Sequence, residues 1–308
     1  MTISKEKSTP SKSRDWDGRS KGGDWGLNFI ISLVGRMSRK GTYFLLDVAL
    51  PFYLPFNRKG FRATREFFEQ RLGCPRVESF FKAWRTHRLF GQMMFDRFRF
   101  FKRGGDGFRI IRDGEDGILD RMKTGDGFII AGSHIGSMEM AGYMLGLKDK
   151  PINALVFGGE VASLQSRRAS ALEERGIKLI PVSNDLSHLF AAKAALDEGE
   201  IVSMPCDRLL GSTKYIECDF FGERARFPMG CFILAAQLEK DMYALFNMKE
   251  GSDTYRVFVR PLKVDREGKT SRVVAAELAQ EYSRELERMV RRYPLQWFNF
   301  YDFWKKDE

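Results

Sequence analysis

The sequence predicts an α/β fold, with a central mixed and mostly parallel sheet flanked by helices, and an N-terminal helical region that associates with a membrane. After residue 104, short β-rich runs alternate with helical stretches, which is typical of a sheet covered by helices. Between residues 25 and 103, apolar residues recur at spacings of three and four, which indicates helices. The 308 residues, 43% of them apolar, are enough to bury a sizeable core.

Three segments follow from these patterns. Residues 1–24 are rich in Lys, Ser, Asp and Gly and predict a flexible basic tail. Residues 25–103 predict the helical, interfacial region, and residues 104–308 predict the α/β core.

The helical region is unusually aromatic, in a chain that contains 27 Phe. Arginines are interspersed among these rings, which favours a surface that settles at lipid headgroups, although core aromatics beside solvated arginines would give the same pattern. The apolar run 27–34 is too short to span a bilayer, and the run 42–56 contains Asp47, Pro51 and Pro55. We therefore expect association with a membrane without a transmembrane helix. The phenylalanines concerned are Phe44, Phe52, Phe56, Phe61, Phe67, Phe68, Phe90, Phe95, Phe98, Phe100 and Phe101.

The core region contains six candidate strands and five candidate helices. The strands are expected at 127–131, 153–157, 177–182, 201–205, 243–247 and 255–264. The helices are expected at 138–147, 161–175, 186–198, 229–239 and 272–292.

Polar residues follow three of the predicted strands. His134 follows the first, the Gly158-Gly159-Glu160 turn follows the second, and Asp207-Arg208 follows the fourth. Ligands of α/β sheets bind at the carboxyl ends of parallel strands. We therefore expect one site that contains both His134 and Asp207.

His134 is the leading candidate for a catalytic base, because it is one of three histidines and lies where the backbone can turn sharply. Glu139, five positions later, could orient its ring, although that spacing in a regular helix separates side chains by about 140°. The contact would need the turn that Gly136 permits.

Other catalytic motifs are missing from the sequence. It contains no Gly-x-Ser-x-Gly elbow, no His-Glu-x-x-His and no Gly-x-x-x-x-Gly-Lys loop. The four widely separated cysteines suggest neither a metal site nor a disulfide framework.

Further residues in order along the chain resemble the lysophospholipid acyltransferase superfamily, and within it the lipid A late acyltransferases. These are His134 to Glu139, Asp207, the Phe220-Phe221-Gly222 turn with Glu223-Arg224-Ala225, Gly230, Ala235-Ala236 and the closing segment 293–298. The segment 16–23 is similar to single-domain relatives found with aryl-polyene or flexirubin-type lipid pathways.

The resemblance implies that residues 104–308 are an acyltransferase core, which moves a fatty acyl chain from an acyl carrier protein or acyl-CoA thioester to a hydroxyl or amine of a lipid. His134 would be the general base and Glu139 its orienting partner. Asp207 and Arg208 would contribute to substrate binding, although Arg208 stands where the family usually has Gln. Phe220, Phe221 and Gly222 would shape the acyl pocket, and neither a metal nor another cofactor is needed.

The family's phosphate-binding arginine has three possible counterparts in this sequence: Arg167, Arg168 and Arg175. We favour Arg168. A solvated helix face beside Glu173 and Glu174 explains these arginines equally well.

The formal net charge of +10 predicts an anionic partner. A membrane surface and an acidic carrier protein both fit, while the absence of a recognition motif disfavours nucleic acid. The resemblance places the protein on the cytoplasmic face of the bacterial inner membrane. A non-catalytic lipid-binding protein that retained the fold is the alternative function.

Overall fold

The structure is a computed structural model that describes residues 37–103, 105–144, 150–157, 176–182, 187–209 and 214–304. The predicted tail, the predicted helix 161–175 with its arginines, and the turn at 158–160 lie outside the described residues.

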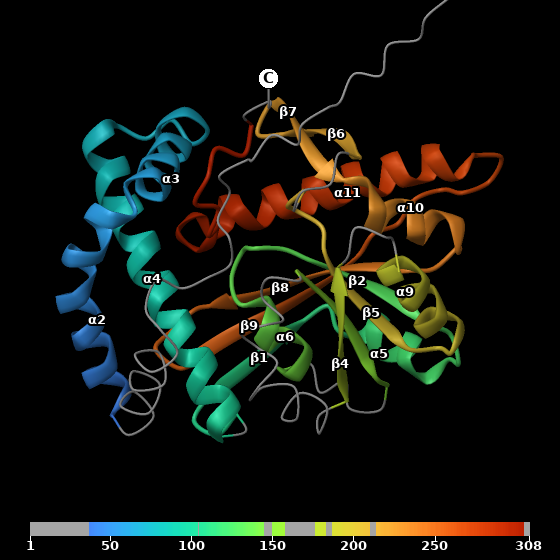
Figure 1. Ribbon diagram of the computed structural model, residues 1–308, viewed down its shortest axis with the longest axis horizontal. Coiled ribbons are helices and arrows are strands. Elements are labelled where there is room, and N and C mark those ends of the chain that lie inside the picture. Colours follow the sequence, from blue (N-terminus) through green and yellow to red (C-terminus); the bar gives the residue numbers. More distant parts are fainter. Residues whose placement is uncertain are drawn as a thin grey trace, which may run out of the picture.

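Helices cover both faces of a seven-stranded sheet, as the sequence predicts (Figure 1). The described helices are α2 (Arg39–Tyr53), α3 (Arg58–Gln70), α4 (Arg76–Arg103), α5 (Asp116–Lys123), α6 (Met138–Met144), α9 (Ser187–Asp197), α10 (Met229–Gln237) and α11 (Ser271–Arg292). Two 3-10 turns, η1 (Leu54–Phe56) and η2 (Pro294–Gln296), complete the helical elements of these ranges.

The sheet has the strand order β1-β9-β8-β2-β5-β3-β4. All neighbours are parallel except β8 and β9, so the mixed, mostly parallel sheet is confirmed. A separate antiparallel hairpin pairs β6 with β7. The strands are β1 (Arg109–Asp113), β2 (Phe128–Gly132), β3 (Ile152–Phe157), β4 (Ile177–Val182), β5 (Ile201–Pro205), β6 (Tyr215–Phe220), β7 (Glu223–Pro228), β8 (Met242–Lys249) and β9 (Thr254–Pro261).

Strand β2 lies inside the sheet, between β8 and β5. Its five residues are all buried, as expected of a parallel strand that helices cover on both faces. Ile129 and Ala131 belong to the core with α9, α10 and α11, whereas Phe128 and Ile130 belong to the core with α4, α5 and α6. The alternation of β2 side chains thus joins the two halves of the interior.

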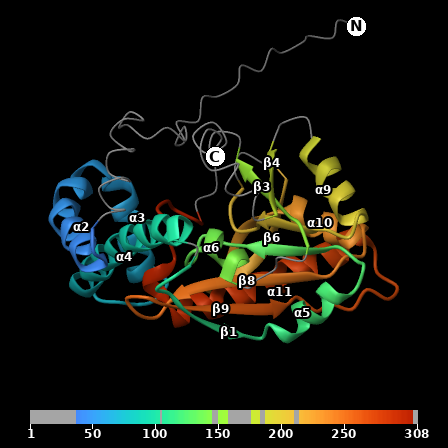
Figure 2. The same cartoon turned by 90° about the horizontal axis from the view of Figure 1, so that it is seen from below.

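The N-terminal helices α2, α3 and α4 are grouped beside one end of the sheet, as Figures 1 and 2 both show. A buried charge network joins this group to the sheet. Asp96 of α4 accepts hydrogen bonds from Lys249 of β8 at 2.5 Å, Tyr255 of β9 at 2.8 Å and Tyr43 of α2. Burial lowers the pKa of Lys249, whereas the Asp96 carboxylate favours its charged form.

No helix of the described ranges combines the length and the hydrophobicity that crossing a bilayer requires.

Candidate active site

The site lies at the carboxyl ends of β2 and β5. The two strands are parallel neighbours, with Gly132 opposite Pro205, and the Cys206 N–H donates to the Gly132 carbonyl at 3.0 Å. His134 lies two residues beyond the end of β2, and Asp207 lies two residues beyond the end of β5. The structure brings them together, as their positions after the strands predict.

Asp207 contacts His134 with both carboxylate oxygens. Oδ2 accepts the His134 backbone N–H at 2.6 Å, and Oδ1 lies 2.7 Å from the ring Nδ1. Asp207 is only 1% exposed, whereas the His134 side chain is 34% exposed. A carboxylate on Nδ1 fixes the ring orientation and leaves Nε2 to exchange a proton.

The carboxylate is stabilised in its charged form. Burial alone would raise the pKa of Asp207, but the charge and hydrogen bonds of His134, together with the Arg208 charge, hold that pKa below its ordinary value. Asp207 is thus an anion placed against an imidazole.

Glu139, the partner expected from the sequence, has a different contact. It lies in the first turn of α6 and forms an ion pair with Arg97 of α4. The guanidinium of Arg97 is largely buried, with 14% of its side chain exposed, and a nearby carboxylate stabilises its charge. Glu139 thus joins α6 to α4, and Asp207 occupies the Nδ1 position assigned to Glu139.

The loop that carries His134 is clamped on both sides. Gly136 adopts φ 68° and pairs with Asn247, so an added Cβ would lie 2.1 Å from the Asn247 carbonyl oxygen. Only glycine fits this close backbone approach without strain. The buried Asn247 side chain donates to the Ser137 carbonyl, and the Ser137 N–H donates to the Asn247 carbonyl.

The C-terminal segment 296–301 holds the other side of the loop. The Gly136 N–H donates to Gln296, and the Phe298 N–H donates to the His134 carbonyl at 3.0 Å. Arg208 donates to the Phe298 carbonyl at 2.8 Å, and its guanidinium lies over the Tyr301 ring. No local pattern in the sequence indicates that Asn247 or Phe298 holds this loop, although the segment 293–298 is among the motifs that carry the resemblance.

Tyr282 of α11 supports the end of β2 from the core. Its hydroxyl donates to the Gly132 carbonyl at 2.6 Å, and burial raises its pKa well above the ordinary value. The Tyr282 hydroxyl thus stays protonated and donates its hydrogen bond to Gly132, which lies two residues before His134.

In the Phe220-Phe221-Gly222 turn, Phe220 is the last residue of β6, and Phe221-Gly222 is the two-residue connection to β7. Phe221 and Gly222 have φ values of 54° and 77°, the positive pair that a type I′ hairpin turn requires. Phe220 is fully buried, and its ring centroid lies 5.7 Å from that of Trp297, the residue that pairs with Ile135 beside His134. The turn therefore reaches the His134 loop through Trp297, while its role in an acyl pocket stays a prediction.

Arg168 lies outside the described residues, so the phosphate-binding arginine stays a prediction. Among the described residues, no group of three His, Cys, Asp or Glu side chains is arranged to hold a metal ion.

The sheet and the imidazole–carboxylate pair define a class: α/β proteins with a candidate acid–base pair at the carboxyl edge of the sheet. The sequence model for the bacterial lipid A biosynthesis acyltransferases matches residues 86–306, and the chain belongs to this family. It is therefore an acyltransferase that acts on lipid substrates.

One solved structure shows a weaker similarity. The 1-acyl-sn-glycerophosphate acyltransferase PlsC from Thermotoga maritima is 15% identical, with a TM-score of 0.39, over 89% of this chain and 98% of PlsC. No curated protein matches the chain in sequence.

Proposed function

We propose that the protein transfers an acyl chain from an acyl carrier protein or acyl-CoA thioester to a hydroxyl or amine of a lipid acceptor, with His134 as general base. The observation that carries this proposal is the two-point contact of Asp207 with His134 beyond adjacent parallel strands. The resemblance implied that Glu139 orients the His134 ring; in this proposal Asp207 has that role.

The reaction begins with the His134 Nε2 taking the proton of the acceptor hydroxyl or amine. No residue of the described chain forms a hydrogen bond with this nitrogen, and the ring is partly exposed. The acceptor oxygen or nitrogen then bonds to the thioester carbonyl carbon. The carbon–sulfur bond breaks, and the thiolate leaves with the proton that Nε2 returns.

Asp207 would act on His134 in two ways. Its negative charge stabilises the imidazolium that forms during proton transfer, and its contact with Nδ1 selects the tautomer with Nε2 unprotonated. The backbone contact fixes the loop at the same time. Arg208 would support the site through Phe298, whereas contacts of Arg208, Phe220, Phe221, Gly222 and Arg168 with substrate remain predictions.

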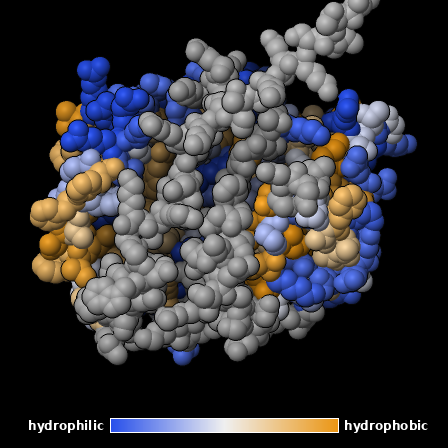
Figure 3. Space-filling view, viewed as in Figure 1, coloured by the Kyte–Doolittle hydropathy of each residue, from blue (hydrophilic) through white to orange (hydrophobic). Residues whose placement is uncertain are grey.

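We further propose that the N-terminal helices place the enzyme on the cytoplasmic face of the inner membrane. Four large apolar residues recur at spacings of four along α2 and η1 and are exposed. They form a hydrophobic area over α2, at the left of Figure 3. An exposed apolar stripe of this kind indicates contact with a lipid surface. Its members are Phe44, Val48, Phe52 and Phe56, with exposed fractions of 70%, 49%, 72% and 90%.

The test of the chemistry is the variant His134→Ala with an acyl carrier protein or acyl-CoA donor and lipid acceptors. We expect an unchanged far-UV spectrum, a lowered melting temperature because the buried Asp207 carboxylate loses its imidazole partner, and a loss of at least about 100-fold in the rate of thioester consumption by the folded variant. Full activity of this variant would contradict the mechanism. A wild-type protein that binds lipid but consumes no thioester with any donor would instead support the non-catalytic alternative.

A further inference from the structure

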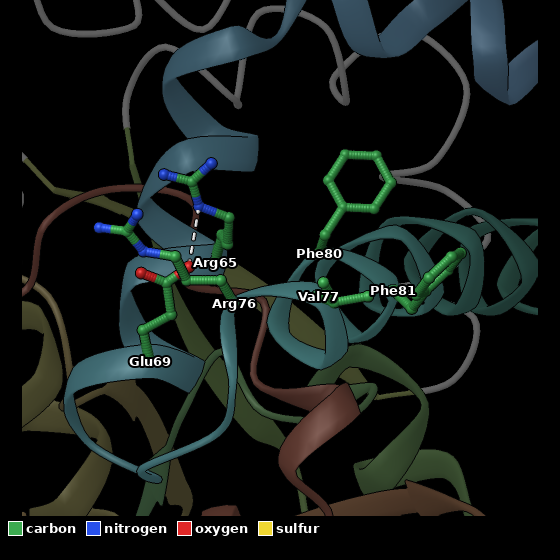
Figure 4. Close-up of a pocket in the computed structure, with 6 residues that line it drawn as sticks. All are labelled: Arg65, Glu69, Arg76, Val77, Phe80 and Phe81. Atoms are coloured by element: carbon green, nitrogen blue, oxygen red, sulfur yellow. Dashed lines mark ion pairs between the residues drawn. The ribbon is translucent and has the colours of Figure 1, made fainter.

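A surface cleft lies between the end of α3 and the beginning of α4. It has a volume of about 530 Å³, and its residues come only from these two helices (Figure 4). The opposite face of α3 presents the buried Phe67 and Phe68 to the core. None of the cleft residues forms a described contact with His134 or Asp207. The lining residues are Arg65, Glu69, Arg76, Val77, Phe80 and Phe81.

One side of the cleft is charged. Arg65 Nε lies 3.2 Å from a carboxylate oxygen of Glu69, and Figure 4 shows the Arg76 guanidinium on the same side of the cleft as this pair. Two guanidinium groups and one carboxylate leave a net charge of +1. A phosphodiester carries one negative charge and would neutralise this side of the cleft.

The other side is apolar and exposed. Val77, Phe80 and Phe81 lie on one face of α4, at spacings of three and four, with exposed fractions of 71%, 44% and 60%. Phe61 of α3 packs edge-on against Phe80, with a centroid distance of 5.2 Å. These side chains offer contact to an aliphatic chain beside the charged group.

We propose that this cleft binds one anionic phospholipid, with its phosphate between Arg65 and Arg76 and its acyl chains along Val77, Phe80 and Phe81. The single net charge and the large apolar side fit a lipid better than an acidic protein surface, which would need several cations. The inference deepens the proposed membrane association and rests on it, because the bilayer supplies the lipid. It is independent of the chemistry at His134.

The test measures binding of the full-length protein to phosphatidylcholine vesicles with and without phosphatidylglycerol. The affinity for phosphatidylcholine vesicles reports the general membrane association. The factor by which phosphatidylglycerol increases that affinity, called the gain below, reports binding in the cleft. We expect Arg76→Gln to reduce this gain at least about tenfold. The matched control Arg85→Gln removes an exposed arginine of the same helix outside the cleft, and should reduce it less than about threefold.

A second pair of variants changes the gain in the opposite direction. Glu69→Gln removes the carboxylate beside Arg65 and should increase the gain several-fold. The control Glu66→Gln removes a neighbouring carboxylate of α3, which pairs with Arg62 at 3.4 Å outside the cleft, and should leave the gain nearly unchanged.

Equal effects of Arg76→Gln and Arg85→Gln, or of Glu69→Gln and Glu66→Gln, would overturn the proposal, because diffuse surface charge would then explain the binding. Effects on the affinity for an acyl carrier protein, with none on vesicles, would also overturn it. If the protein binds to neither lipid mixture, both the membrane association and the cleft proposal, which rests on it, are overturned. Loss of acyl transfer in His134→Ala bears only on the catalytic proposal.

Discussion

Asp207 holds His134 at two points, with one carboxylate oxygen 2.6 Å from the backbone nitrogen and the other 2.7 Å from the ring Nδ1. The contact joins residues separated by 73 positions, and the pairing of β2 with β5 makes it possible. One side chain thus contacts both the backbone and the ring of the proposed base.

Acid should weaken this contact in a defined direction. The pKa of Asp207 is lower in the folded protein than in the unfolded chain, so the stabilisation is present above the ordinary value of about 3.9 and is lost as the pH falls through the lowered one. In urea unfolding below about pH 4, the free-energy difference between wild type and Asp207→Asn should narrow as the pH falls. If the difference in unfolding free energy stays constant or widens below about pH 4, the Asp207 carboxylate does not stabilise the folded protein through its contact with His134.

Gly136→Ala should destabilise the protein by more than about 2 kcal/mol, because the new Cβ would lie 2.1 Å from the Asn247 oxygen at a φ of 68°. The control is Gly230→Ala, where an added Cβ meets nothing within 4 Å in helix α10. We expect that control to be neutral or stabilising by up to about 1 kcal/mol in urea unfolding. Equal stability of the two variants would argue against the clamp.

Lys249→Met should cost about 3–5 kcal/mol of unfolding free energy, because it leaves the fully buried Asp96 carboxylate without its ammonium partner. Lys193→Met removes one member of a half-exposed pair with Asp197 and should cost less than about 1 kcal/mol. Similar costs, measured by chemical denaturation, would show that the Asp96 network does not hold the N-terminal helices to the sheet.

The double variant Phe52→Ser/Phe56→Ser should reduce binding to phosphatidylcholine vesicles at least about tenfold, because each exposed ring contributes apolar area to the lipid contact. Phe190→Ser changes a ring of α9 that is 73% exposed and should leave the binding unchanged. Vesicle flotation distinguishes the two results. Equal losses of vesicle binding in the two variants would mean that α2 contributes no more to membrane contact than other exposed aromatic positions.

Local patterns predicted most of the sheet. The runs at 177–182 and 201–205 match β4 and β5 in both bounds. β5 lies inside the sheet and is a run without charged residues, as is typical of a parallel strand covered on both faces. The edge strand β4 is also mostly apolar, with the exposed Lys178 as its one charged residue. Local patterns did not predict β1 or the hairpin of β6 and β7. Their charged residues, such as Glu217 and Arg226, obscured the alternation of apolar and polar positions.

The site could be predicted only in part. Strand ends indicated that His134 and Asp207 share one edge of the sheet, since neighbouring parallel strands end together. Two features decide that Asp207, and not Glu139, contacts the His134 ring. The register that pairs Gly132 with Pro205 places Asp207 beside the ring, and Arg97 forms an ion pair with Glu139. Both are contacts between residues far apart in the sequence, so they cannot be predicted from the spacing of residues along the chain.

The most direct test compares Asp207→Asn with Glu139→Gln in the same acyl-transfer assay, after melting curves show that both variants fold. We expect Asp207→Asn to lower kcat by about 100-fold or more, because the ring loses its orienting anion, and Glu139→Gln to lower it less than about tenfold. The opposite order, with Asp207→Asn close to wild type and Glu139→Gln nearly inactive, would contradict Asp207 as the partner of the catalytic base.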